Sequence, residues 1–228
     1  MNLKQYELQM RATGLFDGIK TEDLLSIMGC LDARTKEYDK GETIISLHEP
    51  AKRVGIMLEG RASIAREDAF GNQTLMSEAA PGQIFGEVFA CARVEQIPVR
   101  VEAVTDCRIL FLDCRRIITS CTSACEFHHR LIENMLSIMA RKAMALNQKI
   151  EHISKRTTRE KLMSYLTDCA REAGGEEFEL PFNRQQLADY LCVDRSAMST
   201  ELGRLRKDGI IELNKKKIRL RTGEQRRG

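Results

Sequence analysis

The spacing of apolar residues changes along this chain and divides it into segments of different predicted structure. Residues 1–30 have a helical pattern, in which Thr21 is expected to cap a helix. Residues 35–113 instead contain short alternating apolar runs punctuated by glycines, and Gly71-Asn72 has the composition of a hairpin turn. Several short strands at close spacing predict an antiparallel β-roll or barrel.

Residues 123–154 carry one long helical pattern with two apolar stripes. The first stripe repeats at spacings of four and three, which is typical of a coiled-coil seam. One stripe can pack on the β domain while the other pairs with a second copy of the chain; alternatively, the helix packs only on its own domain. Length and regularity favour a dimer. The predicted dimer seam consists of Ile132, Leu136, Met139, Ala143, Leu146, Ile150 and Ile153, and the second stripe of Leu131, Met135 and Ile138.

Residues 183–211 predict a helix-turn-helix. Cys192-Val193 make a tight break, Asp194 is suited to cap the second helix, and Gly209 is expected to end it. The outer face of that second helix is small and polar, with arginines near both ends, so it can enter a DNA major groove. The alternative is a generic helix pair with a solvated charged face. The predicted outer-face residues are Arg195, Ser196, Ser199, Thr200 and Arg204.

Two short strands, 210–213 and 218–220, follow this helix and flank the basic turn 214–217. They predict a wing whose tip, with Lys216, suits phosphate groups. Charge supports this interpretation. Residues 154–228 contain 17 basic and 12 acidic side chains, a net +5, whereas residues 1–153 contain 19 and 21, a net −2. Phosphate contacts require a positive field of this kind.

Length and composition agree with two modest domains joined by a helix. We expect a β-roll effector domain over 1–122, a dimerisation helix over 123–153 and a DNA-binding domain over 154–228, opened by a capping box at Thr157 and Glu160. No apolar run approaches the roughly 20 residues of a membrane span, and the N-terminus lacks the apolar stretch of a signal peptide. The expected location is therefore cytoplasmic, without a membrane partner.

The order of these parts resembles the family of the cyclic AMP receptor protein and the fumarate-nitrate reduction regulator, the CRP/FNR family. The resemblance is carried by KGETII (40–45), RVGIMLEGRASI (53–64), GNQTLMSEAAPGQIFGEVF (71–89) and residues 182–211. It implies an α+β fold with an N-terminal antiparallel β-roll like the cyclic nucleotide-binding jelly roll, a long dimerisation helix and a C-terminal winged helix-turn-helix. It also implies a homodimer that binds inverted-repeat duplex DNA and contacts RNA polymerase.

One departure from the family concerns the effector pocket. Gly86-Glu87 match the pocket of cyclic AMP binders, but Ile97-Pro98 stand where those proteins have an arginine followed by serine or threonine. Ile97 offers no cation and Pro98 no backbone N–H for a cyclic phosphate. Cyclic AMP is therefore not expected as the effector. Arg93 and Arg100 complete the candidate pocket, where they either meet another anion or are merely solvated.

A second departure concerns the cysteines. The oxygen-sensing branch of the family has an N-terminal cysteine cluster, but no cysteine precedes Cys30 here. Cys107, Cys114, Cys121 and Cys125 could hold zinc or an iron–sulfur cluster, although their spacing matches no standard motif. Scattered cysteines in a core are the alternative, and the one that their spacing favours. The cofactor stays unknown at this point.

The resemblance also assigns individual DNA contacts. Arg195 matches the family arginine at the start of the recognition helix, and Arg184 and Gln185 match positions that contact phosphate. Ser196 replaces the glutamate of the cyclic AMP branch, so the family operator cannot be carried over. Three functions compete: a transcriptional regulator that responds to a small molecule or a redox signal, an enzyme, and a cyclic nucleotide-binding protein without DNA function. The chain lacks the common catalytic motifs, so a regulator that is not an enzyme is expected.

Overall fold

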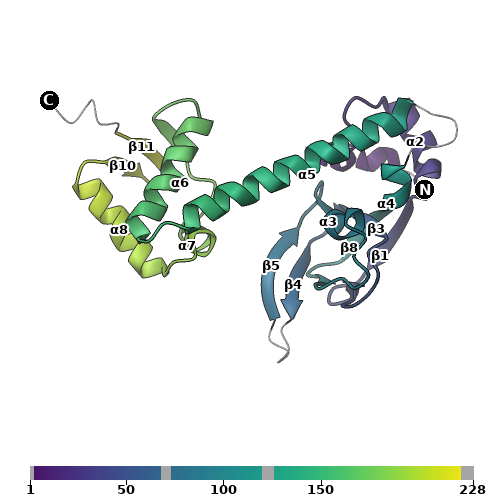
Figure 1. Cartoon of the computed structure of the whole chain (residues 1–228), viewed down its shortest axis with the longest axis horizontal. Helices are drawn as coiled ribbons and strands as arrows, with labels where there is room; N and C mark the ends of the chain where they lie inside the picture. Colours follow the sequence, from purple (N-terminus) through teal and green to yellow (C-terminus); the bar gives the residue numbers. More distant parts are fainter. Residues whose placement is uncertain (1–2, 68–72, 120–125, 222–228) are drawn as a thin grey trace. The chain divides into compact units, whose positions relative to one another are not determined.

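The computed structural model describes residues 3–67, 73–119 and 126–221. It divides into two compact units, Met1–Arg141 and Lys142–Gly228. The division falls within the long helix α5 (Glu126–Ile153), which contributes to both units (Figure 1). The start predicted for this helix at residue 123, and the hairpin turn predicted at Gly71-Asn72, lie outside the described residues.

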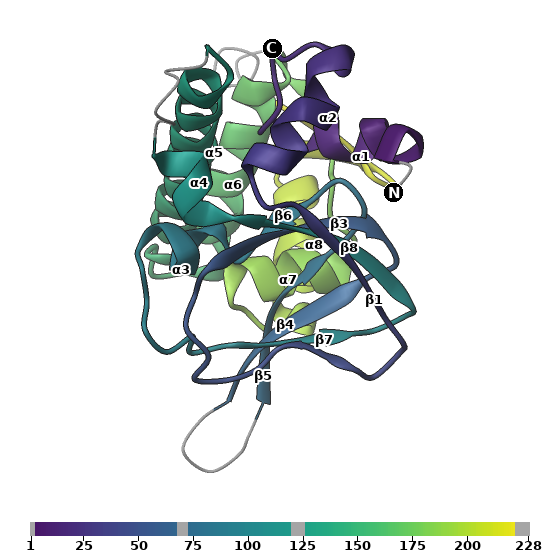
Figure 2. The same ribbon diagram turned by 90° about the vertical axis from the view of Figure 1, so that its right-hand side faces the viewer.

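The N-terminal unit is built on two four-stranded antiparallel sheets. Figure 2 shows them stacked face to face, the arrangement predicted as a β-roll. The first sheet has the order β1 (Arg34–Tyr38), β8 (Cys107–Asp113), β3 (Arg53–Glu59) and β6 (Ile84–Phe85). The second has the order β2 (Thr43–Ile45), β7 (Arg100–Ala103), β4 (Ala62–Glu67) and β5 (Gln73–Ala79).

The first sheet is buried on both faces, which explains the apolar runs in its strands. On β3, Val54 and Ile56 pack in a core shared with the helices, whereas Met57 points between the sheets. On β8, Leu110 packs in the core shared with the helices, and Phe111 points between the sheets. Successive side chains of a strand point to opposite faces, so a strand covered on both faces is apolar throughout.

Short helices cover the outer face of the first sheet: η1 (Leu3–Tyr6), α1 (Glu7–Ala12), α2 (Thr21–Cys30), α3 (Glu87–Cys91) and α4 (Cys114–Ile118). The capping role predicted for Thr21 is wrong. Lys20 is the N-cap of α2 and makes no side-chain cap. The Thr21 hydroxyl instead donates to Glu7 (2.6 Å) and accepts from Arg11 (3.0 Å), so tertiary contacts with α1 outcompete the local cap.

The two stripes of α5 have different environments. Leu131, Met135 and Ile138 are buried in the core of the N-terminal unit, as predicted for the second stripe. Along the predicted dimer seam, Leu136 is 65% and Leu146 59% exposed, whereas Met139 is half-buried and packs against the core of the N-terminal unit. Long apolar side chains in a row on a helix surface are unusual unless a partner covers them.

The C-terminal unit consists of α6 (Thr158–Glu172), β9 (Glu177–Glu179), α7 (Arg184–Leu191), α8 (Arg195–Lys207), β10 (Ile211–Asn214) and β11 (Lys217–Leu220). The capping box of Thr157 and Glu160 is present. Strand β9 pairs with β11 and adds a third strand to the predicted two-stranded wing. Among the described residues, no helix is long and apolar enough to cross a membrane.

Candidate functional site

The turn between α7 and α8 is held by backbone geometry at Cys192. This residue adopts φ +52°, in the left-handed region, and ends α7. The Val193 N–H then donates to the Ala188 carbonyl at 3.0 Å, the six-to-one bond of a Schellman motif. Asp194 follows at once as the N-cap of α8, with its side chain accepting from the Ala197 N–H at 2.9 Å. The predicted break and cap are both confirmed.

Helix α8 has one buried and one exposed face. Its inner residues Met198, Leu202 and Leu205 are at most 1% exposed and pack in the same core as α7 and α6. This packing orients the opposite face of α8 toward solvent. The predicted outer-face residues Arg195, Ser196, Ser199, Thr200 and Arg204 are all exposed.

The C-terminal part of α8 is tied to α6 by a charge network that sequence analysis missed. Glu201 is 8% exposed and accepts from Arg159 of α6 at 3.0 Å and from Arg204 at 3.2 Å. Arg159 also donates to Asp208 at 2.8 Å, and these contacts raise the pKa of Arg159. Arg204 therefore has a structural partner as well as an exposed position. No periodicity marks this network, because its members are up to 49 residues apart.

The start of α7 holds the two predicted phosphate-contacting residues. Gln185 is exposed and donates to Asp189 at 2.8 Å. Arg184 is half-buried, and burial lowers the pKa of its guanidinium. Within the described residues, its buried Nη1 has no hydrogen-bond partner. The helix itself begins with a capping box between Asn183 and Gln186.

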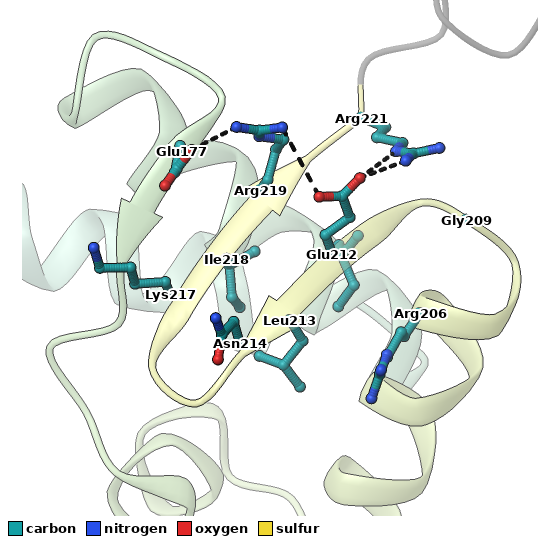
Figure 3. Close-up of a pocket in the computed structure, with 11 residues that line it drawn as sticks. Glu177, Arg206, Gly209, Glu212, Leu213, Asn214, Lys217, Ile218, Arg219 and Arg221 are labelled. Carbon is teal, nitrogen blue, oxygen red and sulfur yellow. Dashed lines mark hydrogen bonds and ion pairs between the residues drawn. The ribbon is translucent and has the colours of Figure 1, made fainter.

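The wing presents lysines at its tip. Strands β10 and β11 are joined by Lys215-Lys216, with Lys215 at φ +54°, and both lysines are exposed. Figure 3 shows Arg219 between Glu177 and Glu212, at 2.8 Å and 3.9 Å respectively. Those ion pairs hold the base of the wing. The Lys216 carbonyl accepts from the Leu180 N–H at 2.9 Å, while the side chains of Lys215 and Lys216 make no hydrogen bond or ion pair with the described residues.

A pocket of about 550 Å³ lies between the wing and the end of α8 (Figure 3). Its lining has four cations against two carboxylates: Arg206, Lys217, Arg219 and Arg221 against Glu177 and Glu212. Arg219 and Arg221 are paired with the carboxylates. The excess positive charge on this surface therefore comes from Arg206 and Lys217.

The candidate effector residues are only partly brought together. Gly86 adopts φ +77° and precedes Glu87, which is 1% exposed at the start of α3. Arg100 points away from the space between the sheets, because its neighbour Val101 is buried there and side chains alternate. Arg100 donates to Thr43 at 2.8 Å. Arg93 is exposed in the turn that follows α3.

Both backbone polar groups of Ile97 are hydrogen-bonded within the protein, so Ile97 has no free donor for a phosphate. Its side chain is 5% exposed, its N–H donates to the Glu49 carbonyl at 2.9 Å, and its carbonyl accepts from the His48 N–H at 3.0 Å. Pro98 has no N–H to offer. In this chain the backbone of Ile97 therefore pairs with the loop that contains His48 and Glu49. In cyclic AMP binders, the corresponding residues hold the cyclic phosphate.

The predicted cysteine set is not assembled in the described part of the chain. Cys107 donates to the carbonyls of Arg61 and Thr105 between the sheets, while Cys114 lies in the other core. Cys121 and Cys125 lie outside the described residues. Within residues 3–67, 73–119 and 126–221, no three His, Cys, Asp or Glu side chains are placed to hold a metal ion.

The end of α5 enters a buried polar cluster that sequence analysis also missed. His152 contacts Asp168 through Nε2 at 3.0 Å and Tyr190 through Nδ1 at 3.1 Å. The rings of Tyr165 and Tyr190 pack against the imidazole. This cluster joins α5, α6 and α7 within the C-terminal unit.

Comparison with known proteins agrees with this architecture. Residues 35–121 match the cyclic nucleotide-binding domain and residues 160–225 match the Crp-like helix-turn-helix domain. The protein named "Probable transcriptional regulator flp" of Lacticaseibacillus casei is 26% identical over 85% of this chain and 87% of its own length. The global nitrogen regulator of Synechocystis sp. is 24% identical over 79% of this chain and 81% of its own.

Solved structures share the fold. The catabolite activator protein of Thermus thermophilus superposes with a TM-score of 0.53 at 18% identity, over 93% of this chain and 96% of its own. The regulator CLP of Xanthomonas campestris has a TM-score of 0.56 at 16% identity, over 89% of this chain and 100% of its own. With a β-roll, a long helix and a winged helix-turn-helix in the order that these proteins share, the chain belongs to the CRP/FNR family of transcriptional regulators.

Proposed function

We propose that this regulator acts as a homodimer that binds an inverted-repeat DNA operator through α8 and the wing. The observation that carries the proposal is the two-sided character of α8. Its inner face is fully buried, while Arg195, Ser196, Ser199 and Thr200 lie exposed on the outer face. Small side chains permit close approach to base edges, and an arginine can bind guanine with two hydrogen bonds.

The dimer is proposed through the α5 seam. Leu136, Leu146 and Ile150 are each more than half exposed on one helical face. A parallel pair of such helices would cover them and relate two α8 helices by a two-fold axis, as an inverted repeat requires. RNA polymerase is a further proposed partner, on the family resemblance alone.

The proposed effector is a small molecule or a redox signal rather than cyclic AMP. Support comes from Ile97, whose backbone groups are occupied by His48 and Glu49, and from Pro98. The signal would act on the N-terminal unit and shift α5 between two positions. The DNA-binding helices would move with α5 between a state that binds DNA and one that does not.

Selection from a random duplex pool tests the proposal. The full chain is expected to enrich an inverted repeat and to bind it in preference to scrambled DNA by at least about 10³-fold at physiological salt. Enrichment of single half-sites would argue against the dimer. Equal affinity for selected and scrambled duplexes would contradict specific DNA binding altogether.

A further inference from the structure

Two cysteines from separate parts of the sequence meet in the N-terminal unit. The Sγ atoms of Cys91 and Cys114 lie 3.5 Å apart. Cys91 is the last residue of α3 and Cys114 the first residue of α4. A disulfide has an S–S distance of about 2.05 Å, so the two sulfurs need to approach by about 1.5 Å to form a bond.

The two thiols differ in access. Cys114 is 1% exposed within the core, while Cys91 is half-buried and packs on its edge. The four other described cysteines make no thiol–thiol contact: Cys30 and Cys192 are exposed, Cys107 donates to backbone carbonyls, and Cys169 contacts Tyr165. A reagent from solvent would therefore reach the pair through Cys91.

The contact also gives the two thiols different pKa values. A hydrogen bond from the Cys114 thiol stabilises the Cys91 thiolate and lowers the pKa of Cys91. The same contact, together with burial, raises the pKa of Cys114. Because Cys91 is the thiol that a reagent from solvent reaches, and the thiolate is the nucleophile, Cys91 is the group that attacks and Cys114 is the one that resolves.

We propose that Cys91 and Cys114 form a redox switch, in which a hydroperoxide converts the two thiols into a disulfide between α3 and α4. The Cys91 thiolate attacks the terminal peroxide oxygen, the O–O bond breaks, and the alkoxide or hydroxide takes up the proton that the Cys91 thiol released. This step leaves a sulfenic acid on Cys91. The Cys114 sulfur then attacks the Cys91 sulfur, the S–O bond breaks, and hydroxide leaves as water with the Cys114 proton. The two thiols supply the two electrons that reduce the peroxide.

The position of the pair indicates what the bond would change. Helix α3 begins directly after Gly86, in the segment that forms the effector pocket of family members, and α4 is the last described helix before α5. A disulfide would hold α3 against α4 and so restrict the segments on either side. This regulatory part of the inference rests on the proposed function, because it requires that the N-terminal unit controls DNA binding.

Peptide mapping after peroxide treatment tests the chemistry without reference to DNA. The reduced full chain is exposed to hydrogen peroxide, its free thiols are alkylated, and it is digested for mass spectrometry. A Cys91–Cys114 linked peptide is expected in wild type and in the matched controls Cys30→Ser and Cys192→Ser, and dithiothreitol should remove it. In Cys114→Ala, dimedone should label Cys91. Cross-links confined to other cysteines, or no cross-link together with no dimedone label, would overturn the switch.

Operator binding tests the regulatory part. Oxidation is expected to change the Kd for the selected operator by about fivefold or more in wild type and Cys30→Ser, and not in Cys91→Ser. An unchanged Kd in fully cross-linked wild type would overturn the regulatory role. If the reduced chain did not prefer its operator to scrambled DNA, the proposed function itself would fail, while the peptide map would still decide the redox chemistry.

Discussion

The imidazole Nε2 of His152 lies 3.0 Å from a carboxylate oxygen of Asp168, and the two side chains are only 3% and 14% exposed. Since the carboxylate accepts, Nε2 carries a proton, and Nδ1 faces the Tyr190 hydroxyl at 3.1 Å. Both ring nitrogens are thereby satisfied in a buried site. Through these two contacts, the last turn of α5 is held against α6 and α7 of the C-terminal unit.

Replacement of His152 by alanine should destabilise the C-terminal unit by about 1–3 kcal/mol, because Oδ2 of Asp168 and the Tyr190 hydroxyl lose their contacts with the imidazole, while Arg171 still binds Oδ1 of Asp168 at 2.7 Å. Urea unfolding followed by circular dichroism measures the effect. The matched control is His129→Ala, since His129 is 80% exposed on α5, and it should cost less than about 0.5 kcal/mol. Equal losses in the two variants would show that the cluster adds no stability.

Charged residues in the α5 seam should dissociate the dimer. Leu136→Glu combined with Leu146→Glu would bury unpaired carboxylates in the proposed interface, at positions that are exposed in the single chain. Light scattering should then report a monomer mass where wild type has a dimer mass. Ala145→Glu is the control, because Ala145 is exposed on α5 but is not part of the seam. A dimer mass in the double variant would place the interface elsewhere.

Arg195 should read a base. Arg195→Ala is expected to lower the preference for operator over scrambled DNA by about 1–3 kcal/mol, as loss of a bidentate guanine contact does. Fluorescence anisotropy with both duplexes gives this ratio. An unchanged ratio would mean that another residue of the α8 outer face carries the discrimination.

Lys216 at the wing tip should contact phosphate rather than bases. Lys216→Ala is expected to weaken operator and scrambled DNA alike, and to reduce the slope of log K against log salt by about 0.9, the effect of one lost phosphate contact. Titrations at several salt concentrations measure the slope. Lys155→Ala, which removes another exposed lysine, between α5 and α6, is the comparison. A loss confined to the operator would instead assign Lys216 to base recognition.

Cyclic nucleotides should not bind. Calorimetry with millimolar cyclic AMP or cyclic GMP is expected to show no specific heat, because Ile97 and Pro98 supply neither a cation nor a free N–H for the phosphate. Micromolar affinity for either nucleotide would refute this expectation. Arg93→Ala and Arg100→Ala would then be the first variants to locate the cation.

The parts of this protein that local sequence determines are those whose physical cause lies within a few residues. The Thr157–Glu160 capping box, the Asp194 cap and the apolar period of α8 each depend on neighbours three or four positions away, so the chain alone predicted them. The alternating runs of the β-roll and the heptad period of α5 are repeats of the same local kind. The family resemblance then supplied the order of the domains.

Tertiary structure decided what depends on distant partners. The Thr21 hydroxyl donates to Glu7 instead of capping a helix, and the Arg100 side chain lies on the outer face of its sheet. Cys91 likewise lies beside Cys114, and His152 is buried against Asp168. Those contacts join residues 14 to 57 positions apart. They form because packing of the apolar faces brings the elements together, and no periodicity along the chain encodes which polar side chains then meet.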